Sequence, residues 1–82
     1  MILNVTDFQI LPDYNLQVTL SNGSQGIFNV KPYLERGIFS ELKDYNYFKT
    51  AKLEYGTIMW KNGQDFSPDT IEMKMKKFQT DE

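Results

Sequence analysis

Residues 56–69 read GTIMWKNGQDFSPD, and they carry the signals of a strand, a tight turn and a helix start. The alternation in the first part sends Ile58 and Trp60, the single tryptophan, to one face of a strand. Asn62 and Gly63 then mark the turn, because both residue types tolerate the positive φ that a type I′ hairpin needs. Phe66 closes the returning strand. We expect the rest of the chain to pack on this unit, with Trp60 in the core.

A helix is predicted directly after this hairpin. Residues 67–69 offer a capping serine, a proline suited to the first helical position and an aspartate that complements the helix dipole. Ile71, Met75 and Phe78 follow at i, i+4 and i+7, which is typical of an amphipathic helix of about three turns. We expect a frayed end from about residue 79.

The N-terminal part predicts a three-stranded antiparallel meander. Its first strand, within residues 2–11, needs a bulge near residues 6 and 7, because Leu3 and Val5 share one parity and Phe8 and Ile10 the other. Turn residues at 12–15 separate it from a cleanly alternating strand at 16–20. The Asn22-Gly23 pair is a strong hairpin signal, and residues 25–30 form the return.

Short helices and one more strand are predicted between the meander and the Trp60 hairpin. Pro32 ends the third strand and starts a short helix that Gly37 can terminate. Asp44 can cap a further turn. Apolar residues at helical spacing lie around it, namely Ile38, Phe39, Leu42, Tyr45, Phe48 and Ala51. Residues 53–55 form the next strand, and Gly56 turns it into the strand of Trp60.

Together these signals predict an α+β fold in one small domain over residues 1–82. We expect an antiparallel sheet of about five strands, made of the N-terminal meander and a C-terminal hairpin, with short helices between them and an amphipathic helix at the end.

Composition excludes several kinds of chemistry. The 82 residues contain no cysteine and no histidine, and their net charge is -2. Disulfides, thiolate metal sites and Ser-His or Cys-His catalytic pairs are therefore excluded. No apolar run is long enough for a membrane span and no secretion signal is visible, so we expect a cytoplasmic protein without a cofactor.

Three groups of residues are candidates for a site. Tyrosine is enriched at protein interfaces, so the tyrosines beyond the capacity of a small core predict an interaction surface; they are Tyr14, Tyr33, Tyr45, Tyr47 and Tyr55. Lys74, Lys76 and Lys77 form a basic patch on the predicted last helix, where Glu72 and Lys76 are spaced for an ion pair. Asp65 and Asp69 are the best carboxylate pair for a metal, although a turn contact for Asp65 and dipole stabilisation for Asp69 explain them more simply.

The order of these motifs resembles the small prokaryotic domain of unknown function 2442, over about residues 3–75. The residues that carry the resemblance are mostly turn and core positions: Asn22, Gly23, Pro32, Gly37, Phe39, Leu42, Gly56, Trp60, Gly63, Asp65 and Pro68. The resemblance implies an α+β domain, and for some members a following helix-turn-helix domain that this chain is too short to hold. It also implies, for others, genes next to those of small proteins suspected to be toxins. Asn29 stands where members often have an acidic residue, which argues against a catalytic carboxylate there.

From these observations we predict a small protein-interaction or regulatory module that is not an enzyme. We expect it to bind another protein. In one version of this prediction, the module is the antitoxin-like or accessory partner of a small neighbouring protein. The alternative is a nucleic-acid-binding accessory protein that uses the basic C-terminal helix, whose binding would weaken steeply with salt.

Overall fold

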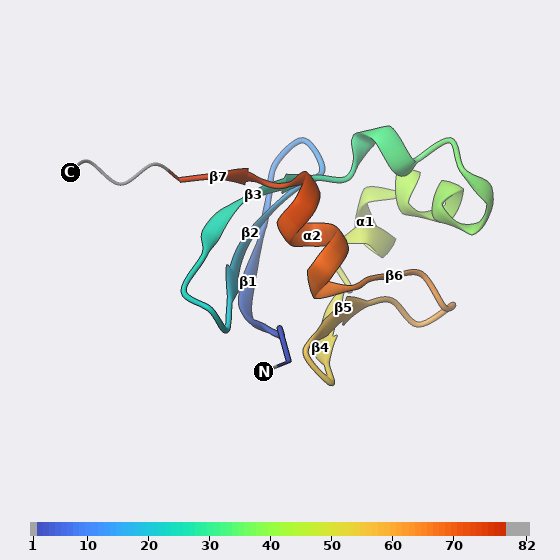
Figure 1. Ribbon diagram of the computed structural model, residues 1–82. Coiled ribbons are helices and arrows are strands. Elements are labelled where there is room, and N and C mark those ends of the chain that lie inside the picture. Colours follow the sequence, from blue (N-terminus) through green and yellow to red (C-terminus); the bar gives the residue numbers. More distant parts are fainter. Residues whose placement is uncertain (1, 79–82) are drawn as a thin grey trace.

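Two antiparallel sheets and several short helices make up the computed structural model, which describes residues 2–78 (Figure 1). The four-stranded sheet has the order β1-β2-β3-β7 and the three-stranded sheet the order β4-β5-β6. The strands are β1 (Val5–Leu11), β2 (Asn15–Leu20), β3 (Gln25–Asn29), β4 (Lys52–Glu54), β5 (Thr57–Met59), β6 (Asp65–Phe66) and β7 (Lys76–Lys77). The α+β class is confirmed, but the prediction of one sheet of about five strands is wrong.

The meander forms as predicted, including its bulge. The register of β1 against β2 shifts between Val5 and Asp7, so Phe8 and Ile10 lie opposite Val18 and Leu16 on the buried face. The strand begins at Val5, later than the sequence suggested. The other face of this sheet is polar apart from Ile27 and Leu11, as expected for an antiparallel sheet with one covered face.

The Asn-Gly turns are hairpin turns, but neither is of type I′. In both loops only the glycine has a positive φ, +90° at Gly23 and +100° at Gly63. The Gly63 N–H donates to the Trp60 carbonyl, and the Trp60 N–H donates to the Gln64 carbonyl. This is a three-residue loop with a glycine bulge. The two central residues with positive φ that define a type I′ turn occur instead at Tyr55 and Gly56, so β4 ends at Glu54 and Tyr55 belongs to the turn.

The predicted C-terminal helix is too long. The helix α2 (Pro68–Lys74) has its Ser67 cap and Pro68 at its start as expected, but it ends after two turns and is followed by β7. The outer edge of β3 explains the change, because β7 pairs with Gly26 and Ile27 and the Phe78 N–H donates to the Gln25 carbonyl on this edge. Gly26 permits this approach: a Cβ at that position would lie 2.5 Å from the Lys76 carbonyl oxygen. The predicted fraying from residue 79 lies outside the described residues.

The middle of the chain is made of short helical pieces, which gather at one end of the molecule (Figure 1). They are the 3-10 helices η1 (Lys31–Tyr33) and η2 (Gly37–Lys43) and the single α-turn α1 (Tyr45–Phe48). Asp44 caps α1 by accepting the Asn46 N–H, as predicted. Gly37 begins η2 instead of terminating the preceding helix. Leu42 is buried as expected, but Ile38 is exposed.

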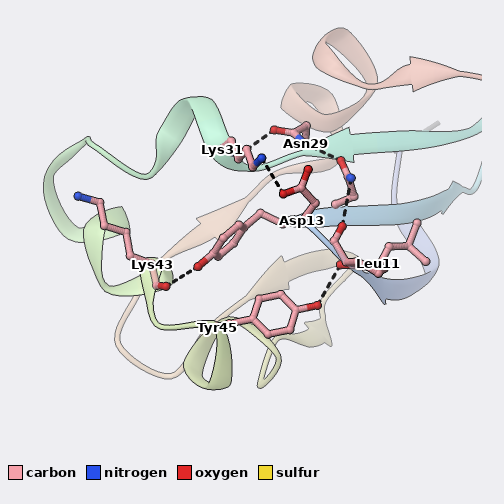
Figure 2. Close-up of polar contacts among 9 residues, drawn as sticks. Leu11, Asp13, Asn29, Lys31, Lys43 and Tyr45 are labelled. Atoms are coloured by element: carbon pink, nitrogen blue, oxygen red, sulfur yellow. Dashed lines mark hydrogen bonds and ion pairs between the residues drawn. The ribbon is translucent and has the colours of Figure 1, made fainter.

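Polar contacts tie these helices to the meander (Figure 2). The Tyr45 hydroxyl donates to the Leu11 carbonyl at 3.1 Å, and the Tyr14 hydroxyl donates to the Lys43 carbonyl. Lys31 pairs with Asp13 at 2.7 Å in the turn between β1 and β2. The β1–β2 turn is therefore held from both η1 and the η2–α1 junction.

Aromatic rings join the two sheets in one core. Phe66 of β6 meets Phe28 of β3 edge to face at 4.9 Å between ring centroids, and it also contacts Trp60 at 5.8 Å. Trp60 stacks on Phe48 of α1 at 5.9 Å and is only 3% exposed, so the prediction of a core tryptophan is confirmed. Ile71 and Met75 bring α2 onto the same cluster.

Trp60→Ala should lower the free energy of unfolding by about 3–5 kcal/mol, because it removes a large buried ring and leaves a cavity between Phe48 and Phe66. Urea unfolding would measure the change. The control is Lys61→Ala, which alters an exposed neighbour and should stay within about 0.5 kcal/mol. A Trp60→Ala protein as stable as the wild type would contradict the core position.

Gly26→Ala should release β7 from β3, because the added methyl group meets the backbone of Lys76 and Lys77. Hydrogen exchange would report this release at the Phe78 N–H, which donates to the Gln25 carbonyl at 2.9 Å. The Leu16 and Phe28 amides should keep more of their protection. Gln25→Ala, at an exposed neighbouring position, should leave Phe78 protected; unchanged exchange in both variants would contradict the proposed role of Gly26.

Candidate functional site

An open groove of about 530 Å³ lies between α1 and the β4–β5 hairpin. Tyr47, Met59 and Trp60 contribute aromatic and apolar surface, and the remaining lining residues are Thr50, Lys52, Glu54 and Lys61. Lys52, Met59 and their neighbours share one face of the hairpin because Lys52 pairs with Met59 across the strands. A soft apolar surface with both signs of charge around it suits a peptide segment of another protein.

Two side-chain hydrogen bonds fix the groove's aromatic walls. The Trp60 Nε1–H donates to the Phe48 carbonyl at 2.8 Å, which fastens the hairpin to the end of α1. The Tyr47 hydroxyl donates to Gln64 Oε1 at 2.8 Å and accepts the Asn62 N–H at 3.0 Å. Tyr47 is therefore held by the loop between β5 and β6, and the groove is preformed.

Gln64 is the centre of this network and is fully buried. Its Nε2 donates to the Ile38 carbonyl at 2.7 Å and to Glu41 Oε1 at 2.8 Å, so all the polar atoms of its amide have partners. Glu41 also accepts from the Asn62 side chain, at 3.2 and 3.3 Å. Sequence reasoning missed both Gln64 and Glu41. The alternation of side chains was the available signal, because Gln64 lies two positions from Phe66 and therefore points to the same, buried side. A polar side chain on that side needs hydrogen-bond partners in the interior.

The tyrosines do not form one exposed surface. Tyr14, Tyr33, Tyr45 and Tyr47 are half-buried against the core. Tyr33 packs on Phe28 and Phe66, whereas Tyr45 and Tyr47 use their hydroxyls internally. Tyr55 is different: it is 94% exposed at the tip of the β4–β5 hairpin, on the same hairpin as the groove. The predicted interaction surface is thus reduced to Tyr47 and Tyr55 near one hairpin.

The three lysines of the predicted basic patch are not on one helix. Lys74 is the last residue of α2, while Lys76 and Lys77 form β7. Lys77 lies 4.0 Å from the Glu72 carboxylate, whereas Lys74 and Lys76 line a hollow together with Arg36. The predicted Glu72 to Lys76 helix pair is wrong for the same reason, since Lys76 lies beyond the helix.

Asp65 and Asp69 belong to different surroundings. Asp65 lies on β6 opposite Met59 of β5. Asp69 lies in the first turn of α2, as expected, and lines a small hollow with Glu72 and Asn22. Within residues 2–78 no group of three or more carboxylates could hold a metal ion.

Among the helices of residues 2–78, none is both long and apolar enough to cross a membrane.

Gln64→Glu should destabilise the protein at neutral pH, because it places a second carboxylate against Glu41 and removes the donor to the Ile38 carbonyl. Repulsion raises the pKa of the introduced carboxyl in the folded state above its unfolded value of about 4.3. The loss of stability is therefore full at pH 7 and shrinks as the pH falls towards 4.

The pH dependence separates this effect from a simple packing defect. The difference in unfolding free energy between the variant and the wild type should be about 2–4 kcal/mol at pH 7 and clearly smaller near pH 4.5. Gln64→Leu, which loses the hydrogen bonds without adding a charge, should show a difference that does not vary with pH. Parallel pH profiles for the two variants would exclude the Glu41 contact.

Comparison with known proteins identifies one family. The family model described as "Protein of unknown function (DUF2442)" matches residues 5–77, nearly the whole chain. No curated protein and no solved structure gives a match. The matched range includes the whole hairpin from Gly56 to Asp69 and both Asn-Gly loops, the motifs on which the resemblance depended. The chain therefore belongs to the DUF2442 family.

Proposed function

We propose that the protein is a non-enzymatic interaction module that binds a segment of another protein in the groove beside the β4–β5 hairpin. The groove itself carries the proposal: Tyr47 and Met59 line it beside the buried Trp60, and internal hydrogen bonds fix both aromatic side chains. A preformed site loses little conformational entropy when it binds, which favours a modest interface on so small a protein.

Tyr55 supports the same proposal. A non-glycine residue with a φ of +53° is strained, and this side chain has 94% of its surface exposed at the hairpin tip. Exposed tyrosines are frequent anchors in protein interfaces, because they bring a large contact area with few rotatable bonds. Tyr55 and the groove together would form a contact surface along one hairpin.

The lack of histidine and cysteine supports a binding role over catalysis. We propose that the partner is a protein, and the family resemblance suggests a small protein encoded nearby as the first candidate. The nucleic-acid alternative loses support from the geometry, because its three lysines are divided between the end of α2 and β7, and Lys77 is next to Glu72.

Affinity capture from the protein's own cells, with and without nuclease, tests this function. The expected result is a partner that co-elutes in stoichiometric amount, survives nuclease and binds directly when both proteins are purified. Met59→Glu and Tyr55→Ala should each weaken that direct binding at least tenfold, since each removes a contact of the size seen at interface anchors. Isothermal titration calorimetry would give the affinities.

The matched control is Gln9→Glu, which makes an exposed change on the polar face of the four-stranded sheet. It should bind like the wild type. Melting temperatures of all variants should be compared first, to exclude unfolding. Binding that is lost with nuclease, or that is insensitive to Met59→Glu and Tyr55→Ala, would overturn the proposal.

A further inference from the structure

A second hollow, of about 370 Å³, lies where β3, η1, α2 and β7 meet. Three cationic side chains line it, Arg36, Lys74 and Lys76, and no acidic residue does. Within residues 2–78 none of the three has an ion pair. The local positive charge contrasts with the net charge of -2 for the whole chain.

Three other lysines of the described chain are close to a carboxylate. Lys31 pairs with Asp13 at 2.7 Å, Lys43 with Glu35 at 3.1 Å, and Lys77 lies 4.0 Å from Glu72. Six cationic side chains have no such partner within residues 2–78, and three of them, Arg36, Lys74 and Lys76, meet around this hollow. They are available to an external anion.

The position of Arg36 is partly fixed before any ligand arrives. Its guanidinium carbon lies 5.4 Å from the centre of the Tyr33 ring, within the range of a cation–π contact. Tyr33 in turn packs on Phe28, Phe39 and Phe66. A guanidinium held on a half-buried ring loses less rotational freedom when it binds a carboxylate.

The other lining residues are mostly apolar. Ile27, Pro32 and Tyr33 contribute hydrocarbon surface. The one neutral amide, Asn29, is already used at both ends: its Nδ2 donates to Asn15 Oδ1 at 2.6 Å, and its Oδ1 accepts the Lys31 N–H at 3.0 Å (Figure 2). The hollow therefore offers three positive charges around a largely apolar surface.

We propose that this hollow binds an acidic peptide segment of a partner protein, with an apolar side chain against Ile27 and Pro32 and flanking carboxylates on Arg36, Lys74 and Lys76. Such a segment matches both kinds of lining, and Arg36 can bind a carboxylate with two parallel hydrogen bonds. The site lies outside the groove of the β4–β5 hairpin and does not depend on the function proposed for that groove.

Two other anions fit the lining less well. Single-stranded nucleic acid stacks successive bases on aromatic side chains, but the hollow has a single aromatic residue, Tyr33, which already contacts Arg36 and three other rings. Free phosphate would use the cations and leave the apolar surface of Ile27 and Pro32 unused. Both ligands are therefore titrated for comparison in the experiment below.

The test is a titration of the isotopically labelled protein, followed by amide NMR shifts at about 20 mM and about 300 mM salt. The probe is a blocked hexapeptide, EDLEDE, with inorganic phosphate and a short oligothymidylate as the other ligands. A second peptide, EDGEDE, lacks the apolar side chain, and QNLQNQ lacks the charges. We expect EDLEDE to shift the amides around Ile27, Arg36 and Lys76, and to bind more tightly than every other ligand.

Charge-matched variants locate the site. Arg36→Gln combined with Lys76→Gln should weaken EDLEDE binding about tenfold, because each removes one charge that faces the peptide. The control variant combines Lys52→Gln with Lys77→Gln. It removes the same total charge, but from residues outside the hollow: Lys52 lines the groove and Lys77 lies next to Glu72. Its affinity for EDLEDE should change less than about twofold. Lys76 and Lys77 are adjacent, so the comparison holds the strand and the net charge constant.

The following outcomes would overturn the inference: shifts that avoid the hollow, an equal effect of the two double variants, or no binding of EDLEDE at low salt. Tighter binding of oligothymidylate or phosphate would assign the site to another class of ligand. Equal binding of EDGEDE would remove the role given to the apolar surface. None of these results depends on the partner sought through the groove.

Discussion

Aromatic packing between the two sheets is the interaction on which the rest of the structure depends. The chain has no cysteine, so packing must provide the stability that disulfides give to many small domains. Phe66 of the second sheet is in contact with Phe28 of the first and with Trp60, which follows β5, and Trp60 continues the contact to Phe48. Each sheet leaves one apolar face uncovered on its own. Burial of Phe66 against the first sheet, and of the adjoining Trp60 against α1, therefore stabilises the short strands of the second.

Much of this fold can be predicted from local sequence because its signals are local. The alternation of residues 16–20, the bulge near Thr6, the Asn-Gly loops and the Ser67 cap all depend on residues within a few positions of one another. The errors have a common cause. Residues after Lys74 have helical spacing, but the open edge of β3 and the missing Cβ of Gly26 favour a strand. The helical spacing of these residues does not reveal that a strand edge distant in sequence competes with it.

The candidate sites were less predictable than the fold, for the same physical reason. Tyr47 was among the predicted interface residues, yet its position depends on Gln64 and Glu41, which no motif marks. The lysines were identified as one patch from their spacing, whereas the structure divides them and adds Arg36 from a loop far away in sequence. Surface chemistry in this protein arises where segments distant in sequence meet. A single sequence indicates which residues are available for such sites, but not which of them converge.

The turn at Tyr55 and Gly56 shows how a local rule and the overall structure can disagree. A type I′ turn favours asparagine, aspartate or glycine at its first central position, and this chain has such pairs at Asn22-Gly23 and Asn62-Gly63. Those pairs form glycine-bulge loops, in which the asparagine side chains reach Glu72 and Glu41, while the β4–β5 turn has a tyrosine at positive φ instead. The left-handed conformation costs a residue other than glycine about 1 kcal/mol, and a side chain that is 94% exposed returns little of this through packing. Packing among the described residues therefore gives little reason for tyrosine at this position, in contrast to Tyr14, which also has a positive φ but packs against Tyr45 and Phe48.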